Sequence, residues 1–181
     1  MQQLPWYETV NGEDIQQGDI LRQYPIFLPN ITPELLQRAI AGENPEATTD
    51  ITLYDVVVLT QTCDLAYQEL DTVILCPVWS LMDVEKELGG NVKEIRNRKE
   101  AIRQGKEPAL HLLAEDSVKQ MPLSLVEFKR IYTSPKKVLT AFAASAGGRL
   151  RIQPPYREHL SQAFARYFMR VGLPLDIPSF K

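Results

Sequence analysis

The chain has 181 residues, of which 44% are hydrophobic and 24% are charged, and its formal net charge at pH 7 is −3. This composition is typical of a folded globular protein and excludes a disordered chain. The mildly acidic balance gives the molecule as a whole no attraction to nucleic acid, so any contact with phosphates has to be local. The length suits one sizeable core, and we expect a single domain over residues 1–181.

The N-terminal part of the sequence predicts a strand followed by a short helix. Gly18-Asp19 is a turn signal, and the partly alternating apolar residues after it predict a strand near 19–28, which lies at an edge or bends at Pro25. Thr32-Pro33-Glu34 has the residues that cap and begin a helix, and Gly42 has the residue type that ends one.

Two segments rich in Val, Ile, Leu and Thr predict the strongest strands, at 53–60 and 72–81. Within the first, "DVVVL" at 55–59 has no polar alternation, which indicates a central strand buried on both faces. The polar residues "TQTCD" follow it directly.

The most charged stretch is 83–107, where Gly89-Gly90 interrupts the pattern and Asn91 can cap a second helix. Two interpretations stay open for it, a solvated surface helix and a phosphate-binding arm, and interleaved glutamates favour the first. Its positive charges are Arg96, Arg98, Lys99, Arg103 and Lys106.

The second half predicts further short strands at 109–114, 124–133 and 150–152, with a small helix or turn beginning at Ser134-Pro135. An amphipathic helix is expected over 155–172, ended by Gly172 and Pro174. Its apolar stripe comprises Leu160, Ala163, Phe164, Tyr167, Phe168 and Val171, and Arg157, Arg166 and Arg170 lie away from it. We expect the protein's own sheet to cover the stripe; the alternative is a partner chain or a homodimer seam.

The sequence predicts no cofactor and no metal site. Its two cysteines, Cys63 and Cys76, and its two histidines, His111 and His159, have no zinc-ligand spacing. It contains no phosphate-binding glycine loop, no G-x-S-x-G and no H-E-x-x-H motif. No apolar run is long enough to span a bilayer and the first residues lack signal-peptide character, so we expect a cytoplasmic protein without membrane contact.

Five segments in chain order are "QQGDILRQYPIF", "DVVVLTQTCD", "DTVILCPVWSL", "GKEPALHLLAED" and "LSLVEFKRIYTSPKKVL". Together they resemble the MazF/PemK-like family, small SH3-like β-barrels best known as endoribonuclease toxins of toxin–antitoxin pairs. The resemblance implies a mainly β protein with appended helices (α+β). It implies a barrel-like core over 18–153 with insertions at 30–50 and 83–107, followed by the C-terminal helix.

Activity in that family is usually attributed to an arginine just before the second strand and a hydroxyl group at the end of the third. Here the first position falls on Tyr54 or Asp55 and the second near Trp79-Ser80, so Ser80 can supply a hydroxyl group while the guanidinium is missing. The resemblance therefore implies a barrel that has lost the nuclease pair. We expect a nucleic-acid- or protein-binding module of a toxin–antitoxin or defence-type system.

Two enzymatic alternatives stay open. One is a ribonuclease with a rearranged site, in which Ser80 or Thr62 handles the proton and a cation comes from 96–103 or from Lys136-Lys137. The other uses Cys63 as nucleophile and His111 as base, with Asp64 orienting the base, although Asp64 raises rather than lowers a neighbouring thiol's pKa. The candidate catalytic residues are Ser80, His111 and Thr62, and the candidate RNA- or protein-binding residues are Tyr54, Trp79, Arg96, Arg98, Arg103, Tyr132, Lys136 and Lys137, of which the aromatic ones can stack on bases.

Overall fold

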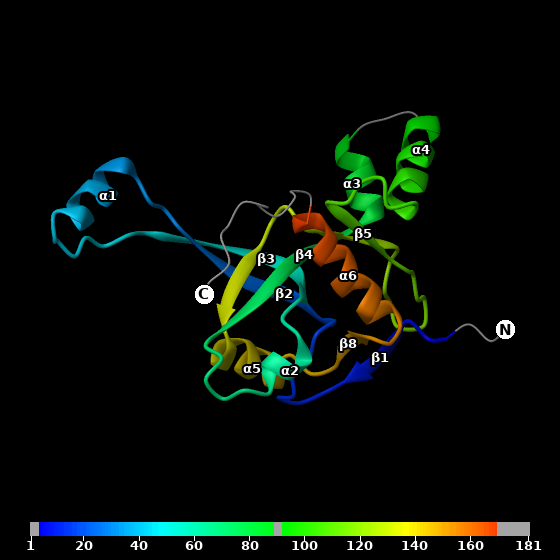
Figure 1. The fold of residues 1–181 in the computed structure, drawn as a ribbon, viewed down its shortest axis with the longest axis horizontal. Coiled ribbons are helices and arrows are strands. Elements are labelled where there is room, and N and C mark those ends of the chain that lie inside the picture. The colour runs from blue at the N-terminus through cyan, green and yellow to red at the C-terminus, as the bar shows by residue number, and fades with distance from the viewer. Residues whose placement is uncertain (1–3, 89–91, 170–181) are drawn as a thin grey trace, which may run out of the picture.

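The computed structural model describes residues 4–88 and 92–169. Over this part of the chain the protein is a mixed α+β fold with one eight-stranded antiparallel sheet and six helices (Figure 1). The elements are β1 (Tyr7–Val10), β2 (Asp19–Pro29), α1 (Pro33–Ile40), β3 (Thr49–Val58), α2 (Thr62–Leu65), β4 (Thr72–Ser80), α3 (Leu81–Leu88), α4 (Val92–Arg103), β5 (Leu110–Leu113), β6 (Ser124–Glu127), β7 (Tyr132–Pro135), α5 (Lys136–Ser145), β8 (Arg149–Ile152) and α6 (Tyr156–Phe168).

The strand order is β1-β8-β2-β3-β4-β6-β5, with β7 pairing additionally with β4. Strand β4 has three partners along its length: β7 at residues 72–75, β3 at 75–77 and β6 at 78–80. The segment 124–133, predicted as one strand, is therefore two strands, because β6 and β7 pair with opposite ends of β4. Strand β1 was not predicted, and 55–59 is confirmed as central, since Val56, Val57 and Val58 are fully buried.

One face of the sheet holds the largest cluster of buried side chains, and α6 covers it. Leu160 of α6 is fully buried in this cluster with Cys76 and Val78 of β4, and Phe164 packs edge-on against Phe128. The expectation that the sheet covers the apolar stripe is confirmed for Leu160, Ala163, Phe164 and Tyr167, whereas Phe168 at the end of α6 is exposed. The predicted helix end at Gly172 and Pro174 lies outside the described residues.

Two smaller clusters lie on the opposite face of the sheet. At the first half of β4, Val73 and Leu75 pack with Leu139 and Ala143 of α5. Just after β4 ends, Leu81 of α3 packs with Leu125 of β6 and Ile102 of α4, and these three form the centre of a separate cluster. The helices α5 and α4 thus cover different ends of the same face.

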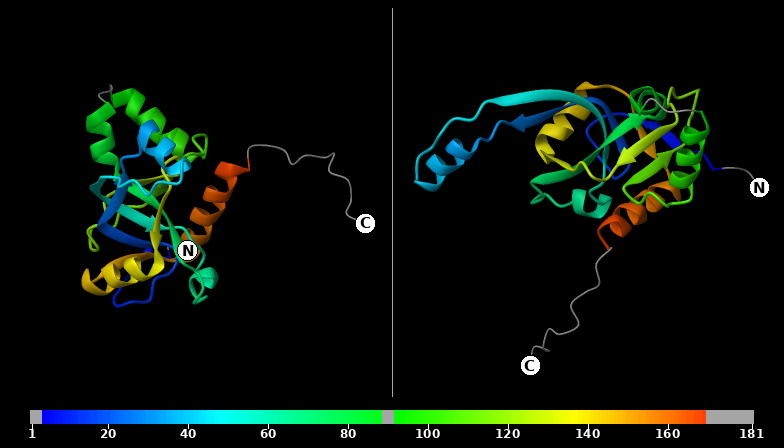
Figure 2. Two further views of the ribbon diagram at one scale, coloured as in Figure 1. Left: turned by 90° about the vertical axis from the view of Figure 1, so that its left-hand side faces the viewer. Right: turned by 90° about the horizontal axis from the view of Figure 1, so that it is seen from above.

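The outer halves of β2 and β3 form a ribbon that projects from the body and ends in α1 (Figures 1 and 2). The predicted helix start is confirmed, because Thr32 Oγ1 accepts a hydrogen bond from the backbone N–H of Leu35 at 3.2 Å. No residue of α1 is buried. We call residues 27–53 the arm, and its exposed large apolar side chains are Phe27, Leu28, Ile31, Leu36, Ile40, Ile51 and Leu53.

A buried carboxylate holds the start of β2 to β8. Asp19 is fully buried; it accepts hydrogen bonds from Arg149 Nε at 2.8 Å and from Arg151 Nε at 2.5 Å. Other guanidinium N–H groups of the two arginines donate to the backbone carbonyls of Gly12 and Asp14, and Arg151 Nη1 also lies 3.5 Å from the Asp14 carboxylate. The network fixes residues 12–19 on the sheet, and each buried charge has a partner.

We expect Asp19→Asn to lower the free energy of unfolding by about 3–5 kcal/mol, because it leaves the buried Arg149 without a carboxylate and Arg151 with only the exposed Asp14. Urea denaturation at pH 7 measures the change. The matched control is Glu100→Gln, which breaks the exposed ion pair with Arg103 and should leave the free energy of unfolding almost unchanged. Equal losses in the two variants would contradict this role for Asp19.

Candidate functional site

Three aromatic side chains from three different strands meet on one face of the sheet. The register that pairs Val56 with Pro77 places Tyr54 of β3 level with Trp79 of β4. The two rings meet edge to face with centroids 5.5 Å apart, and Tyr54 stacks on Tyr132 of β7 at 5.6 Å. We call these three residues the aromatic cluster. All three are half-buried, so their rings are only partly covered by the core.

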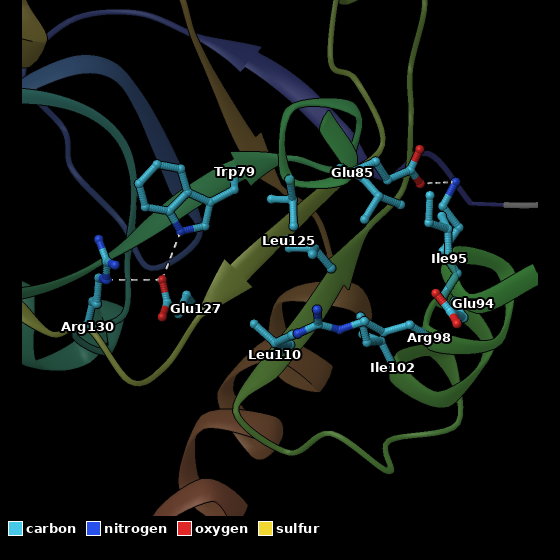
Figure 3. A pocket seen from close by; sticks show the side chains of 13 residues that line it. Trp79, Glu85, Glu94, Ile95, Arg98, Ile102, Leu110, Leu125, Glu127 and Arg130 are labelled. Carbon is cyan, nitrogen blue, oxygen red and sulfur yellow. Dashed lines mark hydrogen bonds and ion pairs between the residues drawn. The ribbon is translucent and has the colours of Figure 1, made fainter. Parts of the chain in front are cut away.

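Trp79 also lines a cavity of about 540 Å³, which we call the cleft (Figure 3). Strands β4, β6 and β5 contribute apolar side chains to one side of it, and α3 and α4 form the other. Its volume falls in the range of small-molecule sites. Its lining residues are Trp79, Leu81, Val84, Glu85, Glu94, Ile95, Arg98, Lys99, Ile102, Leu110, Leu125, Glu127 and Arg130.

At the end of the cleft, Glu127 and Arg130 hold Trp79. Trp79 Nε1 donates a hydrogen bond to Glu127 Oε2 at 3.0 Å, and Arg130 Nε lies 3.4 Å from the same oxygen. The Arg130 guanidinium carbon lies 5.7 Å from the Trp79 ring centroid, which suits a cation–π contact. Burial, and then the neighbouring Tyr54, raise the pKa of Tyr132, so its hydroxyl group stays protonated at neutral pH. Sequence reasoning singled out neither Glu127 nor Arg130.

Positive and negative side chains balance in the cleft. Lys99 forms an ion pair with Glu85, and Arg98 lies 3.5 Å from Glu107. With Arg130 beside Glu127, each of the three cations faces a carboxylate. The cleft therefore suits a ligand recognised by its apolar or aromatic surface more than one recognised by charge alone.

The other predicted binding residues are distributed over the surface. Arg103 lies beside a second cavity, and Arg96 and Lys137 are exposed and line neither cavity. Lys136 Nζ donates to the backbone carbonyl of Tyr67 at 2.8 Å. Of the eight predicted binding residues, the structure thus brings together Tyr54, Tyr132, Trp79 and Arg98 around the cleft.

The candidate catalytic residues do not gather around the cleft. Alternation along β4 directs Ser80 to the α6 face and Trp79 to the opposite face, and the buried Ser80 Oγ has no hydrogen-bond partner among the described residues. Thr62 Oγ1 accepts from the backbone N–H of Gln17 at 3.2 Å. Asp55, at the position of the missing arginine, accepts from the backbone N–H of Gln23 in the bulge of β2.

The two cysteines are free thiols in different environments. Cys63 is exposed, and its Sγ contacts Gln61 and Asp64, whereas no described hydrogen bond joins it to His111. Burial, and then the charge of Glu127, raise the pKa of the Cys76 thiol to about 12. Cys76 is therefore an unreactive core residue at neutral pH.

His111 lies half-buried on β5, and its ring stacks near Phe128 with the ring centroids 6.3 Å apart. Its Nε2 is buried and has no hydrogen-bond partner in the described part of the chain. Burial, and then the nearby His159, lower the pKa of His111 from 6.5 to about 4. The imidazole is accordingly neutral at pH 7.

This lowered pKa predicts a specific pH dependence of stability. Between about pH 6.5 and pH 4 the unfolded chain binds a proton at residue 111 that the folded chain does not bind, so stability falls as the pH falls through this window, by about 2–3 kcal/mol. Urea denaturation at pH 7 and pH 4, in a buffer without phosphate, should show that His111→Gln removes this part of the loss. His159→Gln is the control and should keep most of it; identical pH dependence in wild type and His111→Gln would refute the assignment.

Within 4–88 and 92–169, no three side chains of His, Cys, Asp or Glu are grouped so that they could hold a metal ion. None of the helices in these ranges is long and apolar enough to cross a membrane. Comparisons of the chain with family models, with curated proteins and with solved structures found no match.

Proposed function

We propose that the protein is a binding module without nuclease activity, and that the aromatic cluster stacks the unpaired bases of single-stranded RNA. The observation that supports this most is the meeting of Tyr54, Trp79 and Tyr132 at the end of the cleft, with Arg130 against the Trp79 ring. Aromatic side chains stack on bases of any sequence, at about 1–3 kcal/mol per base.

The proposed framework is the SH3-like barrel of the MazF/PemK type, placed in a toxin–antitoxin or defence-type system. Two observations support this framework. The strands are antiparallel, and the first and last strands of the sheet order, β1 and β5, are linked. The Tyr7 hydroxyl of β1 donates a hydrogen bond to the backbone carbonyl of Ala114, just after β5, at 2.7 Å. Burial, and then Asp116, raise the pKa of Tyr7, which keeps this donor protonated.

Binding without cleavage follows from the charges around the aromatic cluster. Cleavage through the 2′-hydroxyl requires a fixed cation at the phosphate and groups that move protons. Arg130 is paired with Glu127, the side chain of Asp55 cannot supply a cation, and Ser80 faces the other side of the sheet. Arg130 and Arg98 are loosely paired and can exchange their carboxylates for phosphates of the RNA. Because this gives about two phosphate contacts, we expect the affinity for RNA to depend only weakly on salt concentration.

Trp79 fluorescence provides a direct test, because the chain has one other tryptophan, Trp6. In the full chain with Trp6→Phe, we expect a single-stranded RNA of about 8 nucleotides to quench Trp79 and to remain intact. Tyr132→Leu should weaken binding by about 5- to 100-fold, whereas Tyr132→Phe should restore it, because Phe stacks as Tyr does.

The matched control is Tyr67→Leu, since Tyr67 is exposed and lies outside the aromatic cluster. The proposal fails if RNA leaves the fluorescence of Trp79 unchanged, or if Tyr67→Leu weakens RNA binding as much as Tyr132→Leu does. Cleaved RNA in the same mixture would favour the ribonuclease alternative instead.

A second candidate function, protein binding, is favoured by the arm. Seven large apolar side chains are exposed there on a two-stranded ribbon and a helix, elements that are marginally stable in water without a partner. The apolar face of α6 already packs on the sheet, so the arm is the better surface for a homodimer. Phe27 pairs with Ile51 on one ribbon face, and a two-fold axis would place this face against its own copy.

If the arm self-associates, Phe27→Ser with Ile51→Ser should abolish the dimer in sedimentation velocity while changing the free energy of unfolding by less than about 1 kcal/mol. The arm has four acidic and one basic side chain, so added salt should strengthen the dimer by screening like charges, opposite to its effect on RNA binding. A wild-type chain that stays monomeric at high protein and salt concentrations would exclude self-association through the arm.

A further inference from the structure

A second cavity, of about 420 Å³, lies at β5, the strand at the end of the sheet order. It is bounded by α6, by the end of α4 with the loop that follows it, and by Trp6. Ile102 and Leu110 line both this cavity and the cleft. We call it the histidine cavity, and its lining residues are Trp6, Ile102, Arg103, Gly105, Pro108, Leu110, His111, Leu112, His159, Gln162, Ala163 and Arg166.

The described lining of the histidine cavity carries charge of only one sign. It contains two arginines and two imidazoles, of which that of His111 is neutral at pH 7, and none of the described lining residues is acidic. Spacings of three and four residues place His159, Gln162 and Arg166 on one face of α6. Arg103 is paired with Glu100, whereas Arg166 has no ion pair or hydrogen bond within residues 4–88 and 92–169.

Two polar groups in this region lack partners among the residues that the structure describes. One is the Arg166 guanidinium, and the other is the buried Nε2 of His111. Buried polar atoms in folded proteins almost always have a hydrogen-bond partner, so an orphaned imidazole nitrogen beside a cavity indicates a ligand or solvent partner. Because every charged group in the lining is a cation or an imidazole, the complementary ligand is an anion.

We propose that the histidine cavity binds a phosphate monoester with an apolar or aromatic group attached. The phosphate oxygens accept hydrogen bonds from Arg166 and from the imidazole of His159, and they lie beside the ring of His111. The attached group packs on Trp6, Ile102 and Leu110, the apolar side chains of the lining. The exposed ion pair between Arg103 and Glu100 breaks, and Arg103 then binds the phosphate. This site is independent of base stacking at the aromatic cluster.

Occupancy would change the titration of the two histidines. In the free protein, burial and His159 lower the pKa of His111 to about 4. The charged and titratable groups that line the cavity with it are His159, Arg103 and Arg166, and of these His159 opposes its protonation. A phosphate dianion among them favours the protonated ring, so its binding raises the pKa of His111.

The test is NMR of the histidine Cε1–H signals of the full chain, with phenyl phosphate as probe, phenol as the uncharged comparison and inorganic phosphate as the minimal anion. The chain has two histidines, so both signals can be assigned with His111→Gln and His159→Gln. We expect phenyl phosphate to shift both signals saturably, to raise the pKa of His111, and to bind more tightly than inorganic phosphate, while phenol has no effect.

Arg166→Gln should weaken phenyl phosphate binding by about tenfold or more, because a charge-assisted hydrogen bond is lost. The matched control is Arg96→Gln, which removes an exposed arginine of α4 outside the cavity and should leave binding unchanged. If Arg166→Gln does not fold, loss of binding in His159→Gln replaces it.

The proposal is overturned if phenyl phosphate shifts neither histidine, if it shifts only His159 without saturation, or if Arg96→Gln weakens binding as much as Arg166→Gln. RNA binding is followed separately through Trp79, so failure of one site does not imply failure of the other.

Discussion

Strand β4 hydrogen-bonds with β7, β3 and β6 in succession, and the functional geometry depends on this shared strand. Its alternation sends Val73, Leu75 and Trp79 to one face and Cys76 to the other. On the first face α5 covers one end and α4 the other. The aromatic cluster lies between the part covered by α5 and the part covered by α4, because β3 and β7 bring Tyr54 and Tyr132 to the same region as Trp79.

The same alternation separates the chemistry expected of a nuclease. Ser80 follows Trp79 directly and therefore faces the α6 side, where its hydroxyl group is buried without a described partner. At the position of the missing arginine, Asp55 supports the β2 bulge through Gln23. The aromatic cluster has three rings and the guanidinium of Arg130, which is paired with Glu127 and therefore not free to stabilise a phosphate during cleavage. For this reason we propose base stacking and not cleavage.

The parts of the fold that local chemistry determines were predictable. Three consecutive valines at 56–58 indicated the central strand, and Thr32 indicated the start of α1. Contacts between distant segments were not predictable: the division of 124–133 between two ends of β4 depends on pairing, and the ties of Asp19 to Arg149 and Arg151 span about 130 residues. For the same reason Tyr54, Trp79 and Tyr132 could be named from the sequence, whereas their convergence beside Arg130 could not.

Photo-crosslinking of the full chain to single-stranded RNA that contains 4-thiouridine, followed by mass spectrometry of the crosslinked peptides, would locate the bound bases directly. Binding at the aromatic cluster predicts crosslinks to Tyr54, Trp79 or Tyr132 on RNA of unchanged length, and loss of these crosslinks in competition with unmodified RNA. Crosslinks confined to α4 or α6, or RNA shortened by the protein, would contradict it.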